Sequence, residues 1–283
     1  DAKGDLIGVT DQESQTTQFI YSVTDIPHYL NEIKDPLNKT IAKTEYDEQG
    51  RLKKVLNAAN GFTEIAYDPA NQVQTIKDAL GNPTTYVYDQ RGNVIQQVDA
   101  WGHQTLMEYD DDNNLTKVTD PNDLVTKYTY DTQGNLISKT EAAASCGCGG
   151  VPGVTTYTYN SYGQNTSIVL PTGASLKMDY DDRGNMLSMK DGNGNVINSY
   201  TYDRRGNVLT ETDTFGTTRY EYDAIGNVIR STDALGKVTT STYDANGKLK
   251  TLTDEDGTST FSYDKLGRQT KADYGNNIFV EYG

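Results

Sequence analysis

The chain alternates between short runs rich in β-branched and aromatic residues and polar turns that contain glycine. Asn93–Val98, Asn227–Thr232 and Lys237–Tyr243 are examples of these runs. Such runs, bounded by turn residues, are typical of β-strands. No window of about a dozen residues escapes a glycine turn except around Tyr29–Ile33. The pattern predicts a nearly all-β chain, with a short helical turn or loop insertion at residues 29–33.

A tyrosine, usually followed by Asp, recurs about every 21 residues. A fixed period in this range is typical of stacked repeats and not of one globular core. The tyrosines at this position, which we call the register tyrosines, are Tyr46, Tyr67, Tyr88, Tyr109, Tyr130, Tyr159, Tyr180, Tyr202, Tyr222, Tyr243, Tyr263 and Tyr282.

The eleven register tyrosines from Tyr46 to Tyr263 each open a first turn, usually of the form Tyr-Asp-x-x-Gly. Only Gly and, less easily, Asn accept a positive φ without a large steric penalty, so the fifth position is predicted to be left-handed. The Asp, replaced once by Asn160, suits an Asx turn that accepts a backbone N–H two residues on. The fifth position holds Gly50, Gly92, Gly134, Gly163, Gly184, Gly206, Gly226, Gly247 and Gly267, with Asn71 and Asn113 in two other repeats.

A second turn follows about ten residues later and again ends in glycine. Two turns per repeat make each repeat a β-hairpin, and about 22 strands at 4.8 Å spacing would extend on the order of 100 Å. Long sheets twist, so the expected fold is a repeat array of hairpins forming a spiralling antiparallel sheet. The second turns are Asp78–Gly81, Asp99–Gly102, Asp213–Gly216, Asp233–Gly236 and Asp254–Gly257.

Tyrosine is the dominant aromatic residue, with 21 Tyr against 5 Phe and 1 Trp. Strand side chains alternate faces, so tyrosines two residues apart share a face and predict a tyrosine ladder across neighbouring hairpins. Tyr suits a ring that packs while its hydroxyl reaches a partner. A glycan-binding platform would also use aromatic rows, if they were exposed. The tyrosines two residues before the register position are Tyr86, Tyr128, Tyr157, Tyr200 and Tyr220.

Composition agrees with an extended array, since hydrophobic residues make up 35% and the mean hydropathy is −0.70. We expect no deep core and two regions. Residues 1–34 are predicted to be degenerate N-terminal repeats, with Tyr21 as a diverged register tyrosine. Residues 35–283 are predicted to be the regular array, interrupted by an inserted loop at 141–153.

Candidate chemistry is sparse. Cys146 and Cys148, in the inserted loop, are the only cysteines. A soft-metal site, a Cys-x-Cys disulfide and an intermolecular crosslink stay open beside a flexible loop with incidental thiols, because structural zinc needs four ligands. His28 and His103 lie in different repeats without a nucleophile pattern. We predict no catalytic, cofactor-binding or metal residues, and no enzyme.

The net charge is −15 and the pI is near 4.5. This charge disfavours nucleic acids and anionic membranes as partners. The sequence contains no run of 18 apolar residues, so no membrane span is predicted. Unpaired strands at the ends of an open sheet invite edge-to-edge self-association.

The Tyr-Asp-x-x-Gly-Asn/Arg-Leu/Val unit resembles the YD repeat of the Rhs family, which includes bacterial Rhs toxins, Tc toxin cocoon components, wall-associated repeat proteins and teneurins. The resemblance covers residues from about 35 to 283. It implies a β-ribbon that spirals into a hollow shell. It also implies flanking repeats and a C-terminal effector in a longer polypeptide, and a secreted or cell-surface location.

The first expectation is therefore a non-catalytic structural segment of a shell that encapsulates or displays a toxin or effector domain. The alternative is a cell-surface adhesion or carbohydrate-binding array. The burial of the tyrosine rings distinguishes the two hypotheses. A shell needs register tyrosines packed against adjacent hairpins, whereas a lectin needs several rings exposed side by side.

Overall fold

A computed structural model describes residues 4–11, 14–21, 27–59, 61–141, 152–275 and 278–282. These residues form 26 strands in one antiparallel sheet, and they contain no helix. The predicted hairpin repeat array is confirmed. The strand number exceeds the expected value of about 22 because residues before Tyr46 and after Tyr263 also form strands.

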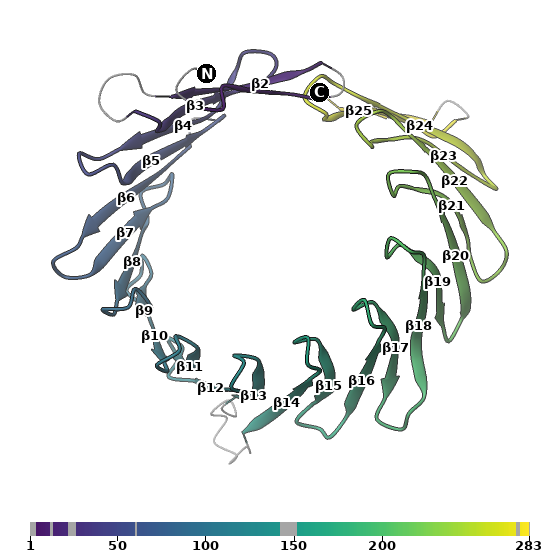
Figure 1. Cartoon of the computed structure of the whole chain (residues 1–283). Coiled ribbons are helices and arrows are strands. Elements are labelled where there is room, and N and C mark those ends of the chain that lie inside the picture. The colour runs from purple at the N-terminus through teal and green to yellow at the C-terminus, as the bar shows by residue number, and fades with distance from the viewer. Residues whose placement is uncertain are drawn as a thin grey trace. The chain divides into compact units, whose positions relative to one another are not determined.

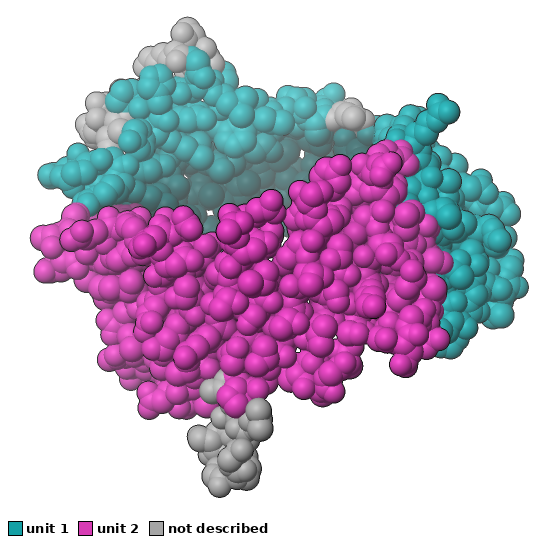
Figure 2. All heavy atoms as spheres, turned by 60° about the horizontal axis from the view of Figure 1, so that its bottom comes forward, with its two compact units in different colours: residues 1–64, 201–283 teal, residues 65–200 magenta. Residues whose placement is uncertain are grey.

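The chain divides into two compact units, coloured separately in Figure 2. Unit 1 holds residues 1–64 and 201–283, and unit 2 holds residues 65–200. Two strands, β6 (Phe62–Asp68) and β18 (Val196–Tyr202), cross the divisions.

The other strands of unit 1 are β1 (Gly8–Thr10), β2 (Thr16–Tyr21), β3 (Leu30–Lys34), β4 (Thr40–Tyr46), β5 (Leu52–Asn57), β19 (Val208–Asp213), β20 (Gly216–Tyr222), β21 (Val228–Thr232), β22 (Val238–Tyr243), β23 (Leu249–Asp254), β24 (Gly257–Tyr263), β25 (Gln269–Asp273) and β26 (Phe279–Glu281).

The other strands of unit 2 are β7 (Val73–Lys77), β8 (Pro83–Tyr88), β9 (Val94–Val98), β10 (Gln104–Tyr109), β11 (Leu115–Thr119), β12 (Val125–Tyr130), β13 (Leu136–Glu141), β14 (Gly153–Tyr159), β15 (Asn165–Val169), β16 (Ser175–Tyr180) and β17 (Met186–Asp191).

Within each unit, strands that follow one another in the sequence pair side by side, as Figure 1 shows for β14 to β17. The pairing shifts by one residue at the register tyrosines. In β12, for example, Thr129 lies opposite Ser138 but Tyr130 lies opposite Leu136. One residue of the partner strand is thus left out of the ladder, as in a β-bulge. The same shift at Tyr21, opposite Leu30, places this residue in the register of the repeats.

Little of the described chain is deeply buried. Met178 and Ala272 are its only buried apolar side chains, which agrees with the absence of a predicted core. Most strand side chains are half-buried. Some cross-strand ion pairs join a half-buried lysine to an exposed carboxylate, such as Lys117 with Glu108 at 2.7 Å and Lys190 with Asp179 at 2.7 Å. Stability must therefore come from repeated contacts between neighbouring hairpins.

The helical turn or loop insertion expected at residues 29–33 is wrong. Leu30–Lys34 forms β3, which pairs with β2 on one side and β4 on the other. This segment lacks a glycine, but pairing on both sides satisfies its backbone and overrides the local signal. The boundary between degenerate and regular repeats at residue 34 stays a prediction.

Candidate functional site at the repeat joints

Each first turn is built around one side-chain oxygen. In the turn at Asp89, Oδ1 accepts the backbone N–H of Arg91 at 2.9 Å and that of Asn93 at 2.9 Å. The N–H of Gly92 donates to the carbonyl of Asp89 at 3.1 Å, and Gly92 has a φ of 88°. Three N–H groups are thus satisfied within five residues, which confirms the predicted Asx turn. The same two side-chain contacts recur at Asp47, Asp110, Asp131, Asn160, Asp181, Asp203, Asp223, Asp244 and Asp264.

The residue after the glycine binds the second carboxylate oxygen. Asn93 Nδ2 donates to Asp89 Oδ2 at 3.0 Å, and in another repeat Arg51 Nε donates to Asp47 Oδ2 at 2.7 Å. The Asn93 side chain is the main reason that the pKa of Asp89 lies below its ordinary value, with help from the backbone N–H groups and against desolvation. These hydrogen bonds therefore stabilise the ionised carboxylate.

The register tyrosines join one hairpin to the one before it. The Tyr130 hydroxyl donates to the carbonyl of Leu115 at 2.9 Å, and Leu115 is the residue opposite Tyr109 at the preceding register shift. The hydroxyl thus satisfies a carbonyl where the ladder is irregular. Equivalent bonds join Tyr46 to Leu30, Tyr159 to Leu136, Tyr180 to Asn165, Tyr222 to Val208, Tyr243 to Val228 and Tyr263 to Leu249.

Burial favours the protonated hydroxyl in four of these tyrosines. Desolvation raises the pKa of Tyr130, Tyr180, Tyr222 and Tyr263 above the ordinary value, so each group stays a hydrogen-bond donor. The register tyrosines from Tyr46 to Tyr263 are half-buried.

Direct ring contact is seen between Tyr29 and Tyr46, with centroids 4.8 Å apart and planes at 82°. The contact that recurs from repeat to repeat is the hydroxyl-to-carbonyl bond described above. A continuous ladder of tyrosine rings in mutual contact stays a prediction.

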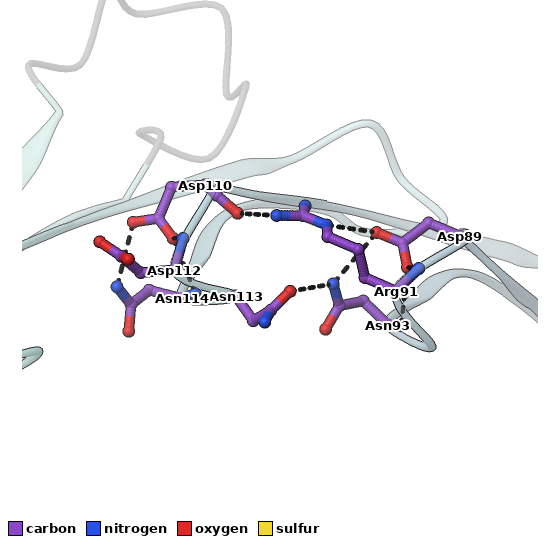
Figure 3. Close-up of polar contacts among 7 residues, drawn as sticks. All are labelled: Asp89, Arg91, Asn93, Asp110, Asp112, Asn113 and Asn114. Carbon is purple, nitrogen blue, oxygen red and sulfur yellow. Dashed lines mark hydrogen bonds and ion pairs between the residues drawn. The ribbon is translucent and has the colours of Figure 1, made fainter.

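Side chains also connect successive first turns directly (Figure 3). Arg91 Nη1 reaches from the Asp89 turn to the carbonyl of Asp110 at 2.6 Å, while Asn93 Nδ2 donates to Asn113 Oδ1 at 2.8 Å. Arg205 likewise bonds the next first turn, at the carbonyl of Ala224, the residue that follows the Asp of that turn. We call the register tyrosine, its Asx turn and these cross-turn contacts the repeat joint.

The cross-turn contacts were missed by the sequence interpretation. Their signal is the Arg three residues after several register tyrosines, as at Arg91 and Arg205. Gln164 Nε2, which donates to the carbonyl of Gly184 at 2.7 Å, shows that a residue outside this position can also bridge two turns.

One first turn departs from the prediction. Asn113 has a φ of 66°, as expected, but Asn71 does not take the left-handed conformation, which falls on Gln72 at 57°. Strand β6 extends through Asp68, and the Tyr88 hydroxyl bonds the Gln74 side chain at 2.6 Å instead of a carbonyl. The structure offers no reason for this shift. A shallow cavity of about 260 Å³ lies at this turn and is lined by Tyr67, Asp68, Pro69, Gln72, Val73, Gln74 and Tyr88.

The remaining candidates do not assemble into a chemical site. Cys146 and Cys148 lie outside the described residues. His28 Nδ1 lies 2.8 Å from Asp5, and His103 Nδ1 lies 2.9 Å from Asp99, in different turns. No group of three or more His, Cys, Asp or Glu side chains that could hold a metal occurs among the residues that the structure describes. The absence of catalytic and cofactor residues stays a prediction.

Across the described ranges, no helix has the length and apolar character to cross a bilayer.

We expect removal of one joint hydroxyl to weaken the array. Tyr243→Phe keeps the ring but leaves the Val228 carbonyl, now 2.8 Å from the hydroxyl, without its donor. The free energy of unfolding should fall by about 1 kcal/mol. Urea titration would measure it. Tyr162→Phe, on a ring that is 78% exposed in a turn, is the matched control and should change little.

A hairpin array with these joints defines a YD-repeat ribbon, and comparison with known families agrees. The teneurin YD-shell model matches residues 53–198, about half of the chain. The RHS repeat model matches residues 180–218, 202–238, 222–259 and 243–277. The chain belongs to the teneurin YD-shell family and carries RHS repeats.

Solved structures of Tc toxins share the fold. A TcdB2–TccC3–Cdc42 chain is 20% identical with a TM-score of 0.64, over 94% of this chain and 16% of that one. The Tc holotoxin pore of Photorhabdus luminescens is 18% identical with a TM-score of 0.61, over 98% of this chain and 20% of that one. This chain thus spans at most a fifth of the length of these two proteins. No curated protein matches its sequence.

Proposed function

We propose that this chain is a non-catalytic structural segment of an Rhs-type shell that encapsulates or displays an effector domain. The observation that carries the proposal is the repeat joint. Its side chains are used to satisfy backbone groups and to connect neighbouring hairpins, and the same set recurs along the array. Contacts of this kind hold neighbouring hairpins together, which is the role of a structural repeat.

The protein-family match supports this role. A YD-shell family assignment, together with the shared fold of the Tc toxin chains, is consistent with a structural part of a larger polypeptide. We infer that flanking repeats and a C-terminal effector are its partners. We further propose a secreted or cell-surface location, as expected of this family.

The carbohydrate-binding alternative is less favoured. A lectin platform needs rings exposed side by side, whereas Tyr130, Tyr180 and Tyr243 are half-buried and use their hydroxyls on the backbone. Among the register tyrosines, Tyr282 is the one classed as exposed, at 49%. A bound sugar would have to compete with these internal hydrogen bonds.

Protease protection tests encapsulation. The open reading frame around this chain would be expressed whole and digested, with the segment behind the repeats followed by mass spectrometry. We expect that segment to resist digestion until the repeats are unfolded. The control is the same segment expressed alone, which should be cleaved quickly. Equal cleavage rates for the two forms, or a reading frame without any segment behind the repeats, would contradict encapsulation.

A further inference from the structure

Three of the four methionines of the chain lie in one β-hairpin of unit 2. Met178 belongs to β16, and Met186 and Met189 belong to β17. The thioether sulfur of methionine is a soft ligand, and soft ligands of this kind select Cu(I) among the first-row metals. This hairpin therefore collects most of the thioether ligands of the chain.

The strand register places the three methionines on the same face of the sheet. Met178 lies directly opposite Met189, and Tyr180 lies directly opposite Met186. Residues opposite one another share a face, and so do residues two apart in one strand. Met186 and Met189 are three apart in the sequence, but the register shift at Tyr180 leaves Leu187 out of the ladder. This bulge returns Met186 and Met189 to a common face.

The polar contacts of the same hairpin support this assignment. Asp179 Oδ2 accepts hydrogen bonds from Ser188 Oγ at 2.8 Å and from Lys190 Nζ at 2.7 Å. These three residues alternate with the methionines along the two strands, so they lie on the other face. Leu187, the residue left out of the ladder, is 40% exposed. The methionines are thus separated from this group of charges by the sheet itself.

The spacing of the three side chains lets their sulfurs meet at one point. Directly opposite residues, such as Met178 and Met189, have Cβ atoms about 5 Å apart, and diagonal neighbours about 7–8 Å apart lie within reach of long side chains. Methionine is unbranched and flexible, so it adapts to such gaps. Met178 is buried, whereas Met186 and Met189 are half-buried and therefore accessible to a small ion.

Packing alone does not call for this group of methionines. The fourth methionine, Met107, occupies the same repeat position as Met178, two residues before a register tyrosine. In that hairpin the other two positions hold Val118 and Leu115. The sulfur of Met107 accepts the Tyr109 hydroxyl at 3.9 Å. The same position in the repeat is thus filled with one sulfur in one hairpin and surrounded by two more in the other.

We propose that Met178, Met186 and Met189 form a binding site for a single Cu(I) ion. Three thioethers give a neutral, soft set of ligands, which hard cations such as Ca²⁺ and Mg²⁺ do not use because they need oxygen. The net charge of −15 favours the approach of a cation. The sequence alone predicts no metal site here, because the common face depends on the register shift. The inference is independent of encapsulation, since it concerns one hairpin and not the contents of a shell.

Nuclear magnetic resonance of the full chain, isotope-labelled in its methionine methyl groups, tests the site. Ag(I), which has the ligand preference of Cu(I) and is stable in air, is the probe. Every sample carries Cys146→Ser and Cys148→Ser, because thiolates are strong metal ligands and would compete for the ion. We expect three methyl signals to shift together and to saturate at one Ag(I) per chain, with the Met107 signal unchanged. Cu(I) added without oxygen should shift the same three signals.

Two variants and one control assign the ligands. Met186→Leu and Met189→Leu each remove one sulfur at nearly constant volume, so the fold is retained, which circular dichroism checks. In each variant the remaining signals should lose their saturable shift, whereas Met107→Leu should change nothing.

The proposal is overturned if the three signals do not move with Ag(I), or if Cu(I) fails to reproduce their shifts. It is equally overturned if the two leucine variants keep the saturable response. A Met107 signal that shifts as strongly as the other three would show adventitious binding to any thioether, and would also overturn it.

Discussion

Replacing Gly216 with alanine is expected to be among the most damaging single substitutions in the array. Gly216 has a φ of 135°, a conformation that L-residues rarely adopt, and an added Cβ would lie 2.7 Å from the Cβ of Ala234. Backbone strain and steric overlap combine, so the free energy of unfolding should fall by about 3 kcal/mol. Chemical denaturation followed by circular dichroism would measure the loss.

Gly236→Ala is the control for that substitution. Gly236 has a φ of 84°, and an added Cβ would meet nothing within 4 Å. Only the left-handed conformation is then penalised, at about 1 kcal/mol. If both variants lost the same stability, the close approach of the Gly216 and Ala234 turns would be contradicted.

We expect acid to destabilise the array, because the carboxylates of its Asx turns become protonated. The pKa values of Asp89, Asp110, Asp131 and Asp181 are lowered from 3.8, mainly by hydrogen bonds from Asn side chains. A lowered folded-state pKa contributes stability that is fully present above the unfolded value and lost as the pH falls through the folded value. The urea midpoint should therefore fall steeply as the pH drops from about 4 toward 2, a window set by the ordinary Asp pKa.

Replacing these four aspartates with asparagine tests the cause. Asn160 shows that the turn accepts an amide: its Oδ1 takes two backbone N–H groups and its Nδ2 donates to Gln164 Oε1 at 3.0 Å. The variant should keep the fold but lose less stability in acid than the wild type. An unchanged acid response would show that other groups, and not the turn carboxylates, govern it.

Local chemistry made the turns predictable. Each first turn contains an Asp that can accept the N–H groups of its own turn and, within five residues, a Gly that accepts a positive φ. These two residues identify the turns at Gly92 and Gly226 from the sequence alone. Both have positive φ, at 88° and 98°. The shift from Asn71 to Gln72 had no such local signal.

Contacts between repeats were harder to predict, because they depend on how strands align. The acceptor of the Tyr130 hydroxyl is fixed by the register shift opposite Tyr109, and the reach of Arg91 to Asp110 is fixed by the distance between successive turns. The prediction of a helical turn or loop at Tyr29–Ile33 was wrong for the same reason, because the pairing of β3 on both sides outweighed the local composition of this segment.

An experimental density map of this chain at side-chain resolution tests the repeat joint most directly. We predict the hydroxyls of Tyr130, Tyr180 and Tyr243 within hydrogen-bond distance of the carbonyls of Leu115, Asn165 and Val228. A map in which these rings turn to solvent, with the carbonyls bound to water, would contradict a wall held together by its tyrosines.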